Sequence, residues 1–222
     1  MPQPFDKDIV KRFKRLYVGA VSDVLDEIGA TGAMDKGIRP LLHGIKICGP
    51  AFTLRAEPTK DGVEATEMFR AIDSTKPGDV MVVDTGMSTD GCLFGELAST
   101  ACKVRGVKGA VIDGFSRDTA EVKKMKFPLY SRGIGLTSSF GRLRTISFDV
   151  PINCGGVQVR PGDLILGDED GVVSIDKKDV EKVLELATKW MKMETRIRRE
   201  LLKRRLAADV FSQYLYHKET DQ

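Results

Sequence analysis

The residues best suited to chemistry in this sequence lie in the short run Ser116-Arg117-Asp118. The run follows residues 110–112, an apolar segment that predicts a strand buried on both faces. In open α/β sheets, ligands bind outside the carboxyl ends of the strands, so Arg117 and Asp118 could hold an anion and a cation side by side. A second interpretation stays open, in which Asp118 caps the helix that follows, Glu121 completes a capping box, and Arg117 is a solvated turn residue.

The elements that must position this pair form one stretch, from Gly95 to Asp118. Small residues at positions 98, 99 and 101 would let a helix pack closely on a sheet, and a turn would then lead into the buried strand. The loop over residues 84–94, which precedes this helix, is rich in glycine and serine. Such a loop places backbone N–H groups beside a helix N-terminus, which favours binding of a carboxylate or a phosphate.

Several common catalytic sites are disfavoured by the residues that the chain lacks. Its two histidines, His43 and His217, lie far from the central stretch, which argues against a Ser-His-Asp triad or a multi-histidine metal site. No G-x-G-x-x-G or Walker sequence indicates nucleotide binding. The central strand offers no lysine for a Schiff base, and Lys108 is predicted in a turn. Carboxylates, an arginine, backbone amides and a hard metal ion remain as the groups available for chemistry.

Composition indicates one domain with a substantial core. The chain has 222 residues, of which 41% are hydrophobic, and its net charge of +3 does not require a nucleic-acid partner. The four cysteines have no C-x-x-C spacing, so we expect small buried hydrophobic residues in a reducing compartment. No apolar run approaches the ~20 residues of a membrane helix, and the first residues do not resemble a signal peptide. We therefore expect a soluble cytoplasmic protein without membrane contact.

The order of predicted elements indicates an α/β fold. Helices are expected over residues 6–15, 20–28 and 65–72. Two short strand pieces are expected around a kink at Gly49-Pro50. Alternating strands and helices over residues 79–132 imply right-handed parallel crossovers. Short strands separated by PGD and DEDG turns then predict a second, antiparallel or mixed sheet layer, at residues 144–148, 157–159, 164–166 and 172–175.

A long helix is expected from Lys177 to about Arg205, because apolar residues recur at helical spacing. Glu194 falls on this apolar stripe, and burying a lone carboxylate costs on the order of several kcal/mol. Two interpretations follow. The stripe bends or ends near Glu194 and leaves it exposed, or Glu194 reaches a site on a neighbouring subunit.

Basic residues gather near the end of this helix, at Arg196, Arg198, Arg199, Lys203, Arg204 and Arg205. RNA could bind such a face, but no aromatic residues are interleaved with the cations for base stacking. We therefore favour a solvated helix face, or contact with an acidic neighbour, and expect no nucleic-acid partner.

The spacing of the central stretch resembles a known family. The sequence G-E-L-A, followed by A-x-x-x-R-G-x-x-G-x-V-I-D-G-x-x-R-D, is similar to the 4-hydroxy-4-methyl-2-oxoglutarate aldolases and the related RraA proteins, regulators of ribonuclease E. Further matching motifs are AVSDVLDEIG, GPAFTLRA, PGDVMVVDTG, FPLYSRG and PGDLILGDEDGVVSI. The resemblance covers about residues 15–195. It implies a single domain over residues 1–205, a C-terminal extension over 206–222, and an α-β-β-α sandwich that resembles the swivelling phosphohistidine domain of phosphotransfer enzymes.

The resemblance also implies roles for the matching residues. Asp118 would bind Mg²⁺ or Mn²⁺, and Arg117 would stabilise the charge that develops on the enolate. Glu96 would transfer a proton, and Glu194 would approach from the adjacent subunit. The residues expected to bind substrate are Gly95, Leu97, Ala98 and Arg117.

The activity implied is a metal-dependent lyase that releases pyruvate from a 4-hydroxy-2-oxo acid, with oxaloacetate decarboxylase activity, in a homotrimer or hexamer. The alternatives are a non-catalytic regulator that binds a ribonuclease or RNA helicase, and an enzyme acting on a sugar acid or sugar phosphate. Proteins closest to the ribonuclease E regulator lose the aspartate that corresponds to Asp118, so its presence favours catalysis. Some aldolases have aspartate where this chain has Glu96, which leaves the reaction type less defined than metal binding.

Overall fold

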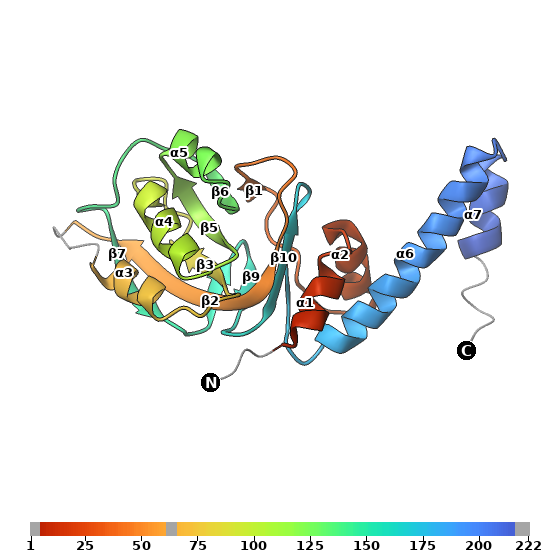
Figure 1. The fold of residues 1–222 in the computed structure, drawn as a ribbon, viewed down its shortest axis with the longest axis horizontal. Coiled ribbons are helices and arrows are strands. Elements are labelled where there is room, and N and C mark those ends of the chain that lie inside the picture. Colours follow the sequence, from red (N-terminus) through yellow and green to blue (C-terminus); the bar gives the residue numbers. More distant parts are fainter. Residues whose placement is uncertain (1–4, 61–65, 216–222) are drawn as a thin grey trace.

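The computed structural model describes residues 5–60 and 66–215 and shows a mixed α/β fold (Figure 1). Its strands are β1 (Arg39–Pro40), β2 (Ile47–Pro58), β3 (Val80–Asp84), β4 (Cys92–Phe94), β5 (Gly109–Ser116), β6 (Leu129–Ile134), β7 (Leu143–Phe148), β8 (Ile152–Cys154), β9 (Val157–Val159), β10 (Leu164–Asp168) and β11 (Gly171–Ile175). Within the described residues, nine strands form one sheet in the order β1-β6-β5-β3-β2-β10-β11, with β4 paired to β5 and β7 paired to β2. The other two, β8 and β9, form a separate antiparallel ribbon.

The helices are α1 (Lys7–Phe13), α2 (Val18–Glu27), α3 (Thr66–Asp73), α4 (Glu96–Val104), α5 (Thr119–Lys124), α6 (Val180–Leu202) and α7 (Ala207–Leu215). The helices predicted over 6–15, 20–28 and 65–72 are confirmed as α1, α2 and α3, although residue 65 lies outside the described residues. The predicted parallel arrangement over residues 79–132 is also confirmed, because β3, β5 and β6 pair in parallel.

The short strands predicted after residue 143 are confirmed as β7, β9, β10 and β11, which pair antiparallel. The predicted second sheet layer is wrong, because β2 joins both halves of the sheet. Its first part, Ile47 to Pro50, pairs antiparallel with β10, and its second part pairs in parallel with β3 from Ala51 onward. The two ends of the sheet also approach each other. Arg39 of β1 donates a 2.6 Å hydrogen bond to the carbonyl of Asp170, beside β11, so the sheet is nearly closed.

The predicted division into two strand pieces at Gly49-Pro50 is also wrong, since β2 runs through both residues as one strand. A Cβ at position 49 would collide with the carbonyl oxygen of Gly78, so glycine is needed for the turn before β3 to pack on β2. Pro50 lies where β2 changes from one neighbour to the next. Gly49 therefore permits the close approach of the Gly78 backbone, and Pro50 lies at the change of neighbouring strand. Neither residue ends β2.

Three hydrophobic clusters surround the sheet. Helices α3, α4 and α5 cover one face, on which Met81, Val83 and Ile112 are buried, whereas Val82 and Val111 point to the opposite face and the β8–β9 ribbon. The third cluster packs α1, α2 and α6 against β10 and β11 (Figure 1). Side chains of β2 belong to all three clusters.

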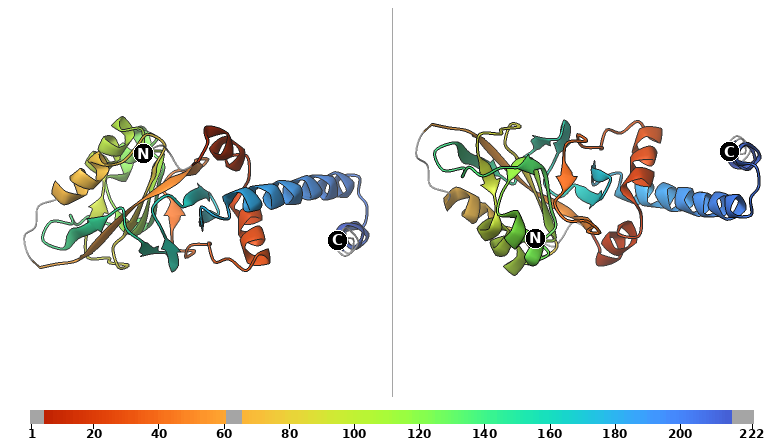
Figure 2. Two further views of the ribbon diagram at one scale, coloured as in Figure 1. Left: turned by 90° about the horizontal axis from the view of Figure 1, so that it is seen from below. Right: turned by 90° about the horizontal axis from the view of Figure 1, so that it is seen from above.

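The long C-terminal helix α6 projects away from the sheet (Figures 1 and 2). It begins at Val180 and ends at Leu202, three residues inside each end of the predicted helix over 177–205. Arg204 has a left-handed backbone with φ of 60°, a conformation typical of a residue just beyond a helix end. The chain then turns back, and α7 buries Val210 completely, with Ile197 of α6 also buried.

All four cysteines are free thiols and buried, which confirms the prediction that they are small hydrophobic residues. Burial raises the pKa of Cys48 and of Cys102 to about 12, so neither forms a thiolate at neutral pH. Among the described residues, no helix combines the length and the apolar content needed to cross a membrane.

Candidate active site at the start of α4

Two parallel strands bring the predicted site residues together. Phe94 of β4 lies beside Ser116 of β5, and the Arg117 N–H donates a 3.1 Å hydrogen bond to the Phe94 carbonyl. The residues that follow each strand, Gly95 and Glu96 on one side and Arg117 and Asp118 on the other, are therefore neighbours. This arrangement places the Arg-Asp pair at the carboxyl ends of strands, as the sequence predicted.

The carboxylate of Asp118 does not cap its own helix. Asp118 occupies the N-cap position of α5, but its side chain makes no capping hydrogen bond there, so the capping-box interpretation is wrong. Instead, the Glu96 N–H, at the start of α4, donates a 3.1 Å hydrogen bond to Oδ2 of Asp118. The backbone of Asp118 is left-handed, with φ of 57°, a conformation that non-glycine residues adopt seldom and that is enriched at functional sites.

Gly95 leaves the space that Asp118 fills. A Cβ at position 95 would lie 2.5 Å from Oδ2 of Asp118 and 3.1 Å from Cγ of Arg117. The backbone of Gly95 is extended, with φ of −148°, so any residue could adopt it. The requirement for glycine therefore comes from the close approach of the Arg-Asp pair.

This contact yields a specific prediction for Gly95→Ala. The added methyl group should displace the Asp118 carboxylate while the fold persists, and a displacement of this kind can cost about 10²-fold in rate. The measurement is the rate of substrate turnover beside a thermal melt. Gly19→Ala is the matched control, because a Cβ there would meet only the Tyr17 ring, at 3.6 Å. Equal rates for wild type and Gly95→Ala would contradict the placement of the site.

The donor set fits a hydrated hard cation. Oδ1 of Asp118 makes no hydrogen bond to any described residue, and the side chain is 40% exposed. The described part of the chain contains no cluster of three or more histidine, cysteine, aspartate or glutamate residues suited to a metal. Mg²⁺ commonly takes one or two carboxylates and completes its shell with water and substrate oxygens. The free Oδ1 atom matches that requirement, and Mn²⁺ accepts the same ligands.

An anion could be held next to this carboxylate. Nε of Arg117 lies 3.5 Å from Oδ2 of Asp118, and the Arg117 side chain is 37% exposed. The N–H groups of Leu97 and Ala98, in the first turn of α4, have no acceptor among the described residues. A guanidinium and two free amides at a helix N-terminus suit a carboxylate ligand.

The Glu96 carboxylate points along its own helix. The Thr100 hydroxyl donates a 2.8 Å hydrogen bond to Oε1 of Glu96, and the Glu96 side chain is partly exposed. A proton transfer by Glu96 thus requires either a different rotamer or an intervening water.

Glu194 lies apart from these residues within one chain. It is on α6, at the opposite end of the molecule from α4 and α5 (Figures 1 and 2). Its carboxylate is half-buried and accepts a 3.2 Å hydrogen bond from Nε1 of Trp190. The structure therefore brings six predicted residues together, at positions 95–98, 117 and 118, and leaves Glu194 outside that group.

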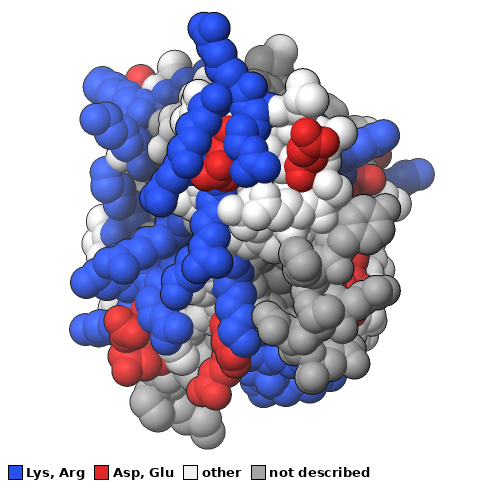
Figure 3. All heavy atoms as spheres, turned by 90° about the vertical axis from the view of Figure 1, so that its right-hand side faces the viewer, with Lys and Arg blue, Asp and Glu red and all other residues white. Residues whose placement is uncertain are grey.

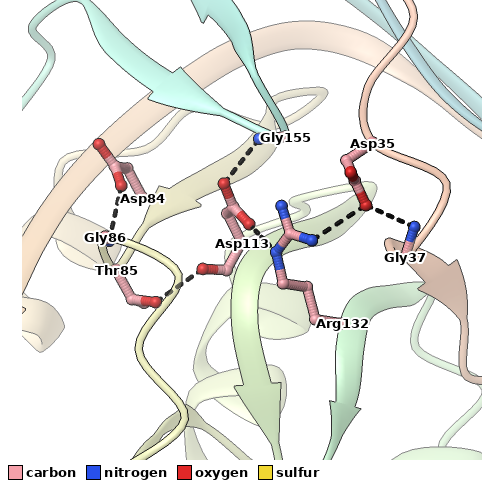
Figure 4. Close-up of polar contacts among 8 residues, drawn as sticks. All are labelled: Asp35, Gly37, Asp84, Thr85, Gly86, Asp113, Arg132 and Gly155. Carbon is pink, nitrogen blue, oxygen red and sulfur yellow. Dashed lines mark hydrogen bonds and ion pairs between the residues drawn. The ribbon is translucent and has the colours of Figure 1, made fainter.

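A buried ionic network that the sequence analysis did not predict is centred on Asp113 of β5 and Arg132 of β6 (Figure 4). The carboxylate of Asp113, which is 3% exposed, accepts hydrogen bonds from Nε of Arg132 and, at 2.7 Å, from the Gly155 N–H. Arg132 also contacts Asp35, at 3.0 Å. The network joins β5, β6, the β8–β9 turn and the loop before β1.

The signal for this network was present in the sequence. Asp113 interrupts an apolar strand, and a buried carboxylate needs a cation or several donors. Ile112 of β5 pairs with Ser131 of β6, so the next residue along each strand, Asp113 and Arg132, could have been matched once the parallel register was known.

The fold and the site together define the class of protein. It is a mixed α/β protein in which one carboxylate, one arginine and the N-terminus of a helix meet at the ends of two parallel strands. The sequence model of the RraA-like family, described as Aldolase/RraA, matches residues 18–174. The chain belongs to this family.

Three known proteins illustrate the relationship. A protein of Halalkalibacterium halodurans, named provisionally as a 4-hydroxy-4-methyl-2-oxoglutarate aldolase, is 35% identical over 182 residues, which cover 82% of this chain and 83% of the relative. Streptomyces coelicolor RraAS2, described as an unusual member of the RNase ES inhibitor RraA protein family, has a TM-score of 0.82 and 29% identity, over 88% of this chain and 98% of that one. An uncharacterized Pseudomonas syringae protein has a TM-score of 0.84 and 26% identity, over 94% of this chain and 99% of that one.

Proposed function

We propose that this protein is a divalent-metal-dependent lyase that cleaves a 4-hydroxy-2-oxo acid, such as 4-hydroxy-4-methyl-2-oxoglutarate, to pyruvate, and that it also decarboxylates oxaloacetate. The observation that carries this proposal is the free Oδ1 of Asp118 beside the Arg117 guanidinium and the unpartnered amides of α4. The name of the Halalkalibacterium halodurans relative supports the same substrate class.

The residues would divide the work as follows. When bound at Asp118, Mg²⁺ or Mn²⁺ supplies Lewis-acid polarisation of the 2-oxo group. The amides of Leu97 and Ala98 hold the substrate carboxylate, and Arg117 donates a charge-assisted hydrogen bond to the 2-oxo oxygen as negative charge develops there. Glu96, directly or through a water, accepts the 4-hydroxyl proton while the C3–C4 bond breaks, and a proton is then delivered to C3 to give pyruvate.

Turnover of oxaloacetate tests the proposal directly. We expect the purified protein to release pyruvate in the presence of Mg²⁺ and to stop when EDTA removes the metal, with activity restored by added Mn²⁺. Pyruvate is followed by its coupled reduction to lactate. The same assay with 4-hydroxy-4-methyl-2-oxoglutarate examines the aldol cleavage. Release of pyruvate from both substrates no faster than in the same mixture without protein, under conditions in which the protein is folded, would refute the proposed activity.

We further propose a homotrimer or a hexamer in which Glu194 of one subunit completes the site of its neighbour. The position of Glu194 on a projecting helix, far from Asp118 of the same chain, is the observation behind this step. Glu194→Gln and Asp118→Asn should each be inactive alone. After the two are mixed and allowed to exchange subunits, activity should return, because some sites then combine two intact residues. Light scattering that finds only a monomer, or mixtures that stay inactive, would contradict a shared site.

The second candidate function is an RraA-type regulator that binds a ribonuclease or an RNA helicase. The similarity to Streptomyces coelicolor RraAS2, over 88% of this chain, favours it. A regulator would show no metal-dependent release of pyruvate, and it would retain its partner in a pull-down after Asp118→Asn. The enzyme predicts the opposite result in the pyruvate assay.

A further inference from the structure

One face of α6 carries a row of cations. Lys192, Arg196 and Arg199 are all exposed and stand at i, i+4 and i+7, a spacing that places them on the same side of the helix. The seven helical steps from Lys192 to Arg199 span about 10 Å. Figure 3, which faces the α6–α7 end of the molecule, shows lysine and arginine side chains gathered along one side.

The N-terminal helix adds two more cations to this row. Arg12, in α1, and Arg15, just beyond it, line a groove of about 310 Å³ together with Lys192, and Leu16 and Met191 contribute apolar contacts. Residues separated by about 180 positions in the sequence are thereby brought to one surface. Arg196 and Arg199 do not line this groove but continue the row of cations beyond Lys192 along α6. We call the five cations Arg12, Arg15, Lys192, Arg196 and Arg199 together the basic groove.

None of these five cations forms an ion pair with a described residue, whereas cations at both ends of the row do. Lys189 pairs with Glu185 at 2.7 Å, and Lys203 pairs with Glu200 at 2.7 Å. Like charges three and four residues apart on a helix repel each other and destabilise the helix. An anionic ligand that spans the middle of the row would relieve this repulsion.

We propose that the basic groove binds the phosphodiester backbone of a nucleic-acid duplex without reading its bases. Four of the five cations are arginines, whose planar guanidinium groups bind phosphate through paired hydrogen bonds. No aromatic side chain of the described residues lines the groove, so the contacts available are those to phosphates. A second copy of the same face is excluded as a symmetric partner, because five cations would then meet five cations.

This inference departs from the expectation that no nucleic acid binds. The lack of interleaved aromatics argues against a stacked single strand, but a duplex keeps its bases paired and presents phosphates alone. The proximity of Arg12 and Arg15 to α6 was not predicted from the sequence. The basic groove contains no residue of the candidate active site, so its role is independent of the proposed lyase activity.

The test uses a fluorescent 20-base-pair RNA duplex of mixed sequence and measures its anisotropy with the full chain between 50 and 200 mM NaCl. In the groove variant all five cations become glutamine: Arg12→Gln, Arg15→Gln, Lys192→Gln, Arg196→Gln and Arg199→Gln. In the control variant five exposed lysines elsewhere become glutamine: Lys36→Gln, Lys60→Gln, Lys76→Gln, Lys108→Gln and Lys123→Gln. Thermal melts confirm that both variants are folded.

Wild type should bind the duplex with a strong salt dependence. The groove variant should lose at least roughly 10²-fold in affinity and about four units of the slope of log K against log salt, since each phosphate contact contributes about −0.9. The control variant should change affinity less than about threefold. Absence of binding by wild type at 50 mM NaCl, equal losses in both variants, tighter binding of a single strand, or tighter binding of polyglutamate, which would indicate an acidic protein partner, would each overturn the inference.

Discussion

Replacing Asp118 with asparagine is expected to slow pyruvate release from oxaloacetate by at least about 10²-fold while leaving the fold intact. Asparagine keeps an oxygen that can accept the Glu96 N–H, so the start of α4 should remain in place. It removes the negative charge that would hold the cation, and Lewis-acid stabilisation is worth several kcal/mol, with each 1.36 kcal/mol equal to a factor of about ten. The coupled pyruvate assay, performed over a range of Mg²⁺ concentrations, measures the effect.

A matched control exists in the same chain. Asp149 is exposed and, like Asp118, has a left-handed backbone, with φ of 56°, but it lies in the turn between β7 and β8. Asp149→Asn should have wild-type activity, and its melting temperature should change by about as much as that of Asp118→Asn. If Asp118→Asn kept its activity, or if both variants lost it equally, the aspartate beside α4 would not be the metal ligand.

Replacing Asp113 with alanine is expected to lower the free energy of unfolding by about 3–5 kcal/mol, the cost of breaking a buried ion pair. The change would leave the Arg132 guanidinium, whose side chain is only 18% exposed, with Asp35 alone. It would also leave the Gly155 N–H without its acceptor. Urea unfolding, followed by circular dichroism, gives the free energy.

The adjacent strand supplies the control for this stability effect. Asp84 of β3 lies directly opposite Asp113 in the parallel register, and its carboxylate accepts one 2.8 Å hydrogen bond, from the Gly86 N–H. Asp84→Ala should cost only about 1 kcal/mol, the value of an ordinary hydrogen bond. Similar losses for the two variants would mean that the ion pair contributes little. A recovery of stability in the double variant Asp113→Leu, Arg132→Met would show that the large loss comes from leaving the Arg132 charge buried without its partner.

The sequence predicted the members of the candidate site better than their contacts. The central stretch placed Arg117 and Asp118 at the end of a strand, and the family resemblance added Gly95, Leu97 and Ala98. The hydrogen-bond partner of the Asp118 carboxylate could not be predicted from the sequence. A capping box within α5 is a local pattern, whereas the observed bond to the Glu96 N–H depends on β4 pairing with β5.

The errors in the fold have the same origin. Gly49-Pro50 is a strong local signal for a break, and only the distant carbonyl of Gly78 explains why β2 continues there. The second sheet layer was inferred from short strands and turns, which do not reveal that β10 pairs with β2. Glu194 lies on α6, far from Asp118 of the same chain, so its contribution to a neighbouring subunit's site stays a prediction.

The continuous strand β2 has a consequence for how the protein loses its structure. Because this strand supplies side chains to each of the three cores, with Leu54, Cys48 and Ile47 as one example for each, no half of the molecule keeps a complete interior without it. Detachment of α6 and its neighbours would expose the same strand on which α3 and α4 rest. The two ends of the protein should consequently unfold together as one cooperative unit. A destabilising substitution at either end should lower the stability of the other.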